Sequence, residues 1–485
     1  MPYASPMIGG PSNASCKGQD RACCPDINTL PDGVLLGIFS FFVKDGSMTA
    51  SGWQTLAHVC QRWRDIVLAS PPRLNLRLVY NGNRPISEMP FVSSVLPVAI
   101  NIAIEDPYQS PSLERFWVNT AAFLESEHCH RICEIDFATV PDPQMERLAA
   151  AMEKPFPQLT YLRICCVDSD AMLLKDSFLG GSAPLLRHLE LQNCWFPGIS
   201  KLGLSPNHLV TLHVQAIPYS GYISPQTWVT ILSVMDRLES FRLEPPYVPR
   251  DPGSRPSLTR SVLPALTELG FEGFHEYLEE LLAQIEVPLL NKLVVTFFTR
   301  DNFVVPQLHH LINHAESFKT CDRATVIHEY STTQFAILKE INGSPELSLK
   351  LELPKSRHRF SSLAQLCSSS LLLPSTLVQL HIRDFHLLGR QSYGEATQCL
   401  EFLDLFIAVK DLSLTEHVGR HVCQVLGELA EERVTEVLPA LQNIFLHHSR
   451  SWESVPSSIQ RFIAARQLSG QPVAVYPWRL ASAEL

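Results

Sequence analysis

The chain has 485 residues, of which 45% are hydrophobic and 18% charged, and its net charge is −10 with a pI near 6.0. This length predicts two domains or one elongated repeat array, and the composition excludes a mainly disordered chain. The acidic balance excludes the basic surface that nucleic-acid binding requires, and no apolar run reaches the ~20 residues that span a bilayer.

Residues 1–26 are rich in Pro, Gly, Ser and Cys and have no hydrophobic periodicity, which predicts a flexible tail. This tail lacks the apolar core of a secretory signal. The 13 cysteines of a chain without such a signal are expected to be reduced thiols. We therefore expect a cytoplasmic or nuclear protein.

Residues 27–78 have a helical pattern and predict a first domain of three short helices. The first helix is expected to begin between Thr29, which can cap it, and Asp32, which favours the positive helix end. Apolar side chains then recur at i, i+3, i+4 and i+7, which predicts one helical face made of Leu35, Ile38, Phe39 and Phe42. The second and third helices are expected over 53–60 and 61–69.

The stretch LPDGVLLGIFSFF, residues 30–42, is apolar on nearly all sides. A helix of this kind is normally buried all round, yet a unit of roughly fifty residues hides only a modest part of its surface. Each large side chain left exposed forgoes about 1.5–3 kcal/mol. The surplus is expected to pack against the remainder of the chain or against another protein, and composition alone leaves both open.

From residue 79 onward the chain repeats the phrase L-x-x-L-x-L with conservative replacements. The copies are 23 to 32 residues apart except for one step of 87, and they begin at Ile132, Leu159, Leu186, Leu209, Leu238, Leu266, Leu290, Leu377, Val409 and Leu441.

This spacing is typical of leucine-rich repeats, in which each phrase is a short strand with its leucines in a shared core. We predict a mixed α/β fold over residues 79–485, a curved leucine-rich-repeat-like solenoid with parallel strands and helices. Unrelated α/β strands are the alternative interpretation. The step of 87 equals three ordinary steps, so residues 300–375 have room for two degenerate copies, and the alternating segment 346–353 is one candidate strand.

Residues that flank the inward leucines alternate onto the opposite face of each predicted strand. Their charges are mixed, which favours a protein partner over nucleic acid. The candidates for a substrate-binding face are Tyr161, Arg163, His188, Glu190, Gln192, His213, Gln215, Arg242, Glu244, Glu268, Glu272, Gln379, His381 and Arg383.

No catalytic motif is found, so we expect no enzyme, no catalytic residue and no cofactor. Zinc sites usually combine two separated ligand pairs, and no segment of this chain provides them. We therefore expect no metal at the His-Cys clusters and pairs, which are His128-Cys129-His130 with Cys133, His310/His314 and His417/His421.

The N-terminal domain resembles the F-box motif of fungal, basidiomycete-type F-box proteins. The resemblance depends on the Leu30-Pro31 pair, the helix with Leu35, Ile38 and Phe39, the Val59-Cys60 pair, and Trp63 followed by Arg64. The segments SPPRLNLRLVY and SVLPVAINIAI and the ending FIAARQLSGQPVAVYPW also resemble such proteins. The chain departs from the motif in the insertion-like KDGSMTASG between the first two helices.

This resemblance implies a non-catalytic substrate-recognition subunit of an SCF-type (cullin-RING) ubiquitin ligase. The F-box would bind a Skp-family adaptor, and through it the cullin and RING subunits, while the repeats capture an unknown protein substrate. The residues that would meet the adaptor are Leu30, Pro31, Leu35, Ile38, Phe39 and Trp63, although some of them, Trp63 above all, can instead hold the three helices together. The alternative is a ligase-independent leucine-rich-repeat scaffold.

Overall fold

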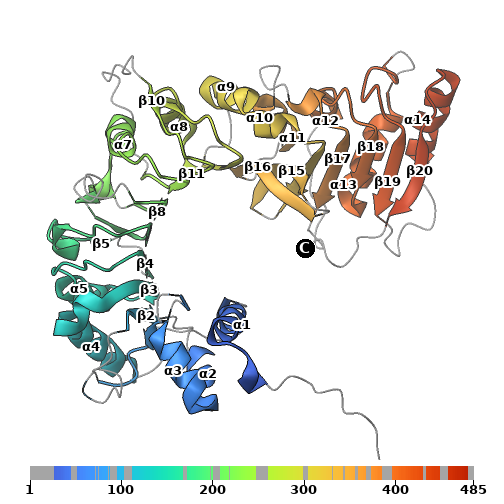
Figure 1. The fold of residues 1–485 in the computed structure, drawn as a ribbon. Coiled ribbons are helices and arrows are strands. Elements are labelled where there is room, and N and C mark those ends of the chain that lie inside the picture. The colour runs from blue at the N-terminus through green and yellow to red at the C-terminus, as the bar shows by residue number, and fades with distance from the viewer. Residues whose placement is uncertain are drawn as a thin grey trace, which may run out of the picture. The chain divides into compact units, whose positions relative to one another are not determined.

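A computed structural model provides the fold, shown in Figure 1. The described residues are 27–44, 52–70, 73–74, 76–85, 87, 96–102, 112–167, 172–196, 198–199, 208–217, 219–246, 260–298, 304–329, 331–341, 344–354, 359–367, 373–384, 396–429, 433–447 and 457–478. The predicted flexible tail, residues 1–26, lies outside the described residues.

The chain divides into two compact units, Met1–Val79 and Tyr80–Leu485. The first unit contains a 3-10 turn and three α-helices, which are η1 (Ile27–Thr29), α1 (Asp32–Lys44), α2 (Gly52–Val59) and α3 (Gln61–Ala69). The predicted helices over 53–60 and 61–69 are thus confirmed to within one residue. Strand β1 (Leu78–Tyr80) lies at the boundary between the units.

The first unit has a small aromatic and aliphatic core. Leu35, Leu36 and Phe39 of α1 are buried, and the Phe39 ring lies 4.8 Å from the ring of Trp63 on α3. The Trp53 indole on α2 donates a hydrogen bond of 3.0 Å to the carbonyl oxygen of Arg77. These contacts join all three helices and the segment that follows them.

The four residues predicted to share one face of α1 differ in burial. Leu35 and Phe39 point into the core, but Ile38 and Phe42 are exposed and Leu36 is buried in their place. The helix is apolar on nearly every side, so its periodicity contains little information on which side is inward.

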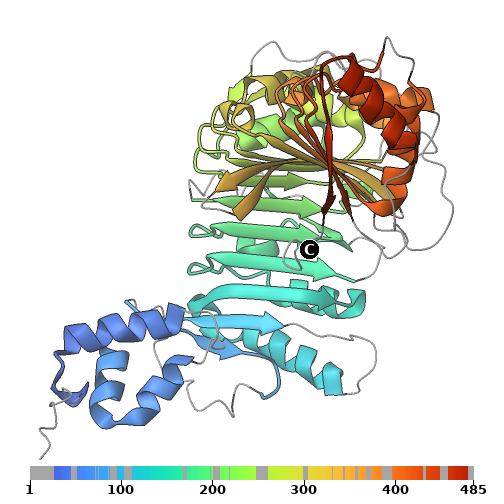
Figure 2. The ribbon, with the colours of Figure 1, turned by 90° about the vertical axis from the view of Figure 1, so that its right-hand side faces the viewer.

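The second unit is built on one large, mostly parallel sheet, whose strands lie side by side in Figures 1 and 2. Its strand order is β2-β3-β4-β6-β8-β9-β11-β13-β16-β15-β14-β17-β18-β19-β20. The strands are β2 (Val98–Ile102), β3 (Ile132–Val140), β4 (Tyr161–Cys166), β6 (His188–Gln192), β8 (Thr211–Gln215), β9 (Ser240–Leu243), β11 (Glu268–Gly273), β13 (Lys292–Phe297), β14 (Arg323–His328), β15 (Thr332–Ile341), β16 (Ser344–Pro354), β17 (Gln379–Asp384), β18 (Asp411–Leu414), β19 (Asn443–His447) and β20 (Ala474–Trp478).

All ten L-x-x-L-x-L phrases run into strands of this sheet. Along the strands buried and half-exposed residues alternate, because successive side chains of a strand point to opposite faces. The central leucines meet in register, as Leu162 pairs with Leu189 and Leu189 with Leu212, and all three are buried. The phrase therefore specifies a row of buried leucines that crosses the sheet from strand to strand.

Helices cover the buried face; Figure 1 shows α5, α7 and α8 on one side of the strands. The helices are α4 (Ser112–Glu125), α5 (Asp142–Ala151), α7 (Pro225–Leu232), α8 (His275–Leu282), α9 (Pro306–His314), α10 (Glu316–Lys319), α11 (Arg359–Leu366), α12 (Ala396–Leu403), α13 (Glu416–Gly427) and α14 (Ser457–Leu468). Short 3-10 segments are η3 (Glu127–Arg131), η4 (Phe178–Gly181), η5 (Tyr219–Gly221) and η6 (Leu373–Ser375), and two-residue strands form two small sheets, β5 (Met172–Leu173) with β7 (Cys194–Trp195) and β10 (Ser261–Val262) with β12 (Ile285–Glu286).

The long step of 87 residues contains an antiparallel insertion. Strand β16 pairs parallel with β13, and β14 pairs parallel with β17, so these two strands fill the two places that the spacing left open. Between them lies β15, antiparallel to both. The strand expected at 346–353 is confirmed as β16. In the sheet, β16, β15 and β14 separate the first seven of the ten phrase strands from the last three.

Candidate protein-interaction surfaces

The first surface is an apolar stripe on α1, which we call the α1 stripe. It is made of Val34, Ile38, Phe41 and Phe42, all exposed. Their spacing of i, i+4, i+7 and i+8 places them on one side of the helix. Ile38 is 44% exposed and Phe41 is 78% exposed. Helix α1 therefore presents a second apolar face in addition to the one that forms the core.

The residues predicted to meet an adaptor fall into two groups. Pro31 and Ile38 are exposed and Leu30 is half-buried, so these can contact a partner. Leu35 and Phe39 are buried, and the half-buried Trp63 packs against Phe39. Leu35 and Phe39 are therefore core residues and not surface contacts. Phe41 was missed, because it lies off the stripe that the periodicity favoured.

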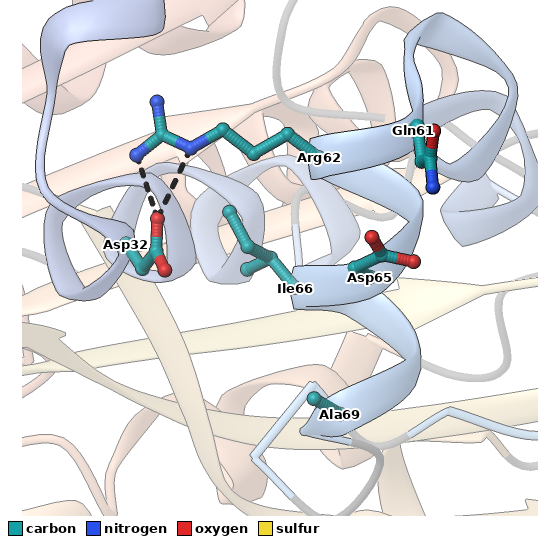
Figure 3. Close-up of a pocket in the computed structure, with 6 residues that line it drawn as sticks. All are labelled: Asp32, Gln61, Arg62, Asp65, Ile66 and Ala69. Atoms are coloured by element: carbon teal, nitrogen blue, oxygen red, sulfur yellow. Dashed lines mark hydrogen bonds and ion pairs between the residues drawn. The ribbon is translucent and has the colours of Figure 1, made fainter.

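An open hollow of about 610 Å³ lies between the start of α1 and the outer side of α3, as Figure 3 shows. The Arg62 guanidinium on α3 bonds to the Asp32 carboxylate on α1 at 2.6 and 3.2 Å, and to the carbonyl oxygen of Leu30 at 2.7 Å. Ile66 and Ala69 line the hollow below this pair. The pair ties the start of α1 to α3. Because it is largely exposed, it adds at most about 1 kcal/mol to stability.

The second surface is the face of the large sheet that lies opposite the leucines, which we call the sheet face. Candidates on adjacent strands are register partners there: Arg163 pairs with Glu190, Glu190 with His213, and His213 with Arg242. The sequence predicted a common face for these side chains, and the strand register places them in one row across it. It did not predict their partners Asp136, Ser240 and Lys292.

Charges on strands β3 to β13 form a charge ladder. Arg163 lies 3.8 Å from Asp136 and 3.5 Å from Glu190, between the two carboxylates. Further along, Glu268 accepts from Arg242 at 2.6 Å and lies 3.2 Å from Lys292. Opposite charges therefore alternate over β3, β4 and β6 and again over β9, β11 and β13.

Hydrogen bonds and rings join the two ends of the charge ladder. The His188 ring stacks on Tyr161 with centroids 4.4 Å apart, and its Nε2 lies 3.6 Å from Glu190. His213 Nε2 lies 2.9 Å from the Ser240 hydroxyl oxygen in a hydrogen bond. Burial and the neighbouring Arg242 lower the pKa of His213 to about 4, so this imidazole is neutral at pH 7.

The carboxyl pKa values follow the local pairing. The neighbouring His188 imidazole and the Arg163 guanidinium lower the pKa of Glu190. Burial works to raise the pKa of Glu268, but hydrogen bonds from Arg242 and Lys292 outweigh it and the pKa is lowered. For Glu244 and Glu272, burial and repulsion from a neighbouring glutamate raise the pKa. The sheet face thus contains a carboxylate that is paired with cations, Glu268, and two whose pKa is raised, Glu244 and Glu272.

The remaining candidates lie at other positions on the sheet. Gln192 and Gln215 pair at the ends of β6 and β8. Gln379, His381 and Arg383 belong to β17, which the antiparallel insertion separates from the charge ladder. The structure therefore does not join all candidates into one site.

The predicted metal-ligand candidates form no cluster. Among the described residues no group of three or more His, Cys, Asp or Glu side chains is placed to hold a metal ion. His130 Nδ1 is bonded to the Glu127 carbonyl oxygen, and Cys133 donates to the carbonyl oxygen of Val98. His310 and His314 stack on each other at 4.0 Å. In the same described part of the chain, no helix is long and apolar enough to cross a membrane.

Comparisons with known proteins add little to this geometry. No family model and no curated protein matches the chain. Among solved structures, the chain is similar to the leucine-rich repeat-containing protein LegL7 from Legionella pneumophila, at 12% identity and a TM-score of 0.26. That match covers 73% of this chain and 95% of the other.

Proposed function

We propose that this protein is the non-catalytic substrate-recognition subunit of an SCF-type ubiquitin ligase, as the F-box resemblance of residues 27–78 implies. The first unit binds a Skp-family adaptor, which connects it to cullin and RING subunits. The sheet face of the second unit captures the protein substrate. A subunit of this kind performs no chemistry and acts by raising the local concentration of substrate near the charged conjugating enzyme.

The observation that supports adaptor binding is the α1 stripe. The core of the first unit is closed by Leu35, Leu36 and Phe39, so the unit does not need a second apolar face for its own folding. Large apolar side chains that lie together on a surface mark a protein-binding site. The half-buried Leu30 and the exposed Pro31 precede the stripe and extend it toward the start of α1.

Substrate capture on the sheet face is supported by its chemistry. The charge ladder presents both signs within a few strands, which suits local complementarity to another protein and not the uniform charge of phosphates. The strands also hold the ladder residues at fixed spacing, because each is paired on both sides in the sheet. Side chains on rigid elements bind with less loss of conformational entropy.

The test is co-purification of the full chain with a Skp-family adaptor. In the variant Ile38→Asp/Phe41→Asp two charges replace exposed side chains of the α1 stripe, and we expect capture to fall by at least about tenfold, or 1.4 kcal/mol. The control Val118→Asp introduces a charge at a position of similar exposure, 46%, in the second unit and should leave capture unchanged.

Two results would overturn the proposal. A folded wild-type chain that captures no adaptor would favour the ligase-independent scaffold. A control that loses the adaptor as fully as the stripe variant would show that the stripe is not the docking surface. Circular dichroism of each variant separates lost binding from lost folding.

A further inference from the structure

One part of the sheet face differs from the charge ladder beside it. At Gly270 on β11 and Val294 on β13 the outward row has short side chains, where the neighbouring strands have Arg242 and Lys350. The gap is a hollow of about 100 Å³. Its walls include Gln215, Glu244, Glu272 and Thr296, which provide oxygen atoms, and Arg242, whose guanidinium is paired with Glu268 at 2.6 Å.

The two carboxylates of the hollow differ from Glu268, which pairs with two cations. Glu244 accepts a hydrogen bond of 3.0 Å from the amide of Ala216, and no ion pair involving Glu244 or Glu272 is found in the part of the chain that the structure describes. Lys350, the register partner of Val294, is paired with Glu352 at 2.7 Å. Burial raises the pKa of both carboxyls. Repulsion from Glu272 adds to the rise at Glu244, and repulsion from Glu352 adds to it at Glu272, where Lys350 opposes it.

An aromatic pair directly follows β11 and β13, the strands that carry Glu272 and Thr296. Phe274 and Phe298 come two residues after Glu272 and Thr296, and the rings are 5.7 Å apart in an edge-to-face arrangement. Their backbones are joined by a hydrogen bond of 3.0 Å from the Phe298 amide to the Gly273 carbonyl oxygen. Phe298 is 40% exposed, so the ring provides an apolar surface beside the carboxylates.

We propose that this part of the sheet face binds a lysine- or arginine-containing extended segment of the protein substrate. The cationic head lies in the hollow between Glu244 and Glu272, and the aliphatic stem packs on Phe298. Carboxylates supply the opposite charge, and an exposed ring supplies the contact that the long stems of these side chains favour.

This inference rests on the proposed function in taking the sheet face as the substrate-binding surface, and it names the substrate class. It also excludes phosphorylated segments at this place, because two unbalanced carboxylates would repel a phosphate. A neutral peptide would leave both charges buried and unpaired, which costs free energy. The chemistry of the hollow therefore selects for a cation.

The experiment measures fluorescence anisotropy of a labelled peptide of alternating lysine and glycine with the full chain. A twin peptide with acetyl-lysine at the same positions has the same length and stems without the charge. We expect saturable binding of the lysine peptide, and at least tenfold weaker binding of its acetylated twin. In Glu244→Gln/Glu272→Gln, which keeps the side-chain shape, the lysine peptide should bind at least about tenfold more weakly.

The matched control removes the same net charge elsewhere. Glu146 and Glu239 are exposed carboxylates outside the hollow, and Glu146→Gln/Glu239→Gln should bind the lysine peptide as the wild type does. A second variant, Gly270→Ala, places a methyl group within 2.6 Å of the Arg242 side chain and narrows the hollow. It should weaken binding without any change in charge.

Three results would overturn the inference: no binding by the wild type, equal binding of both peptides, or equal loss in the hollow variant and its control. The last would show only general attraction to an acidic protein. Adaptor capture is read separately, since the hollow variant should retain it in full. If the wild-type chain binds the lysine peptide but captures no adaptor, the ligase function is refuted and the cation-binding surface is still supported.

Discussion

Two phenylalanines on α1, two positions apart, are predicted to have opposite roles. Phe39 is 1% exposed and packs on Trp63 at 4.8 Å, whereas Phe41 is 78% exposed. We expect Phe39→Ala to unfold or nearly unfold the first unit and to leave the second unit folded. We expect Phe41→Ala to leave the stability of both units unchanged.

The magnitudes follow from burial. Truncating a buried Phe to Ala costs about 3–5 kcal/mol. The Trp63 contact belongs to this loss, since aromatic pairs contribute roughly 0.5–1.5 kcal/mol beyond area burial. A unit of about fifty residues is stable by roughly 2.5–7.5 kcal/mol, at 0.05–0.15 kcal/mol per residue. Phe39→Ala thus removes most of that stability. Phe41 has little buried area to lose, so its truncation costs about 0.5 kcal/mol or less.

Limited proteolysis at increasing urea concentrations follows the unfolding of the two units separately. Cleavage within the first unit should begin at much lower urea in Phe39→Ala than in the wild type, while fragments of the second unit persist. Phe41→Ala should give the wild-type pattern and fail only in adaptor capture. Equal destabilisation by the two substitutions would refute our assignment of inner and outer faces, and so would a loss of stability in Phe41→Ala alone.

Glycine and glutamate substitutions provide four further predictions. Gly37→Ala should raise the stability of the first unit by about 0.5–1 kcal/mol, because no atom lies within 4 Å of the added methyl group and alanine favours the helix. Gly427→Ala should lower the melting temperature, because its methyl group would meet the Ser458 carbonyl oxygen at 2.4 Å. Glu268→Gln should destabilise at pH 7, and the difference should vanish as the pH falls through the lowered pKa of Glu268. Glu272→Gln should stabilise at pH 7, and this gain should vanish below the ordinary carboxyl pKa, since the charged form is the one that the fold disfavours. Urea titrations across pH check the two glutamates, and an unchanged melting temperature in Gly427→Ala would contradict the close contact of α13 with α14.

The strands were the most predictable part of the fold. The phrase L-x-x-L-x-L has period two, which fixes both the strand and its inward face, and Leu162, Leu189 and Leu212 meet in register as the phrase requires. The pairing direction of 332–341 was not predictable. Alternation shows which residues share a face, but it has no information on the neighbour or its direction. Strand β15 therefore emerged only from the structure.

The side chains of the sheet face were predictable by position and not by contact. Arg163 and Glu190 were expected on one face, but sequence spacing alone does not give the distance between them. For the same reason the sequence did not predict the hollow, which depends on two short residues, Gly270 and Val294, being in register. On α1 the failure has another cause, since a helix that is apolar all round has no periodicity that distinguishes Ile38 from Leu36.

The two surfaces are expected to respond differently to salt. The α1 stripe is apolar, and the attraction between apolar surfaces is not screened by ions. The hollow at Glu244 and Glu272 acts through charge, and the screening length falls from about 10 Å at 0.1 M salt to about 3 Å at 1 M.

Raising the salt concentration should therefore release the lysine peptide while the adaptor stays bound to the same chain. Both ligands can be followed in one titration by labelling them with different fluorophores. Parallel release of the two would mean that one kind of interaction holds both, and the assignment of apolar docking to α1 and charged docking to the sheet face would be wrong. Retention of the lysine peptide at 1 M salt would point instead to packing on Phe298 as the main source of affinity.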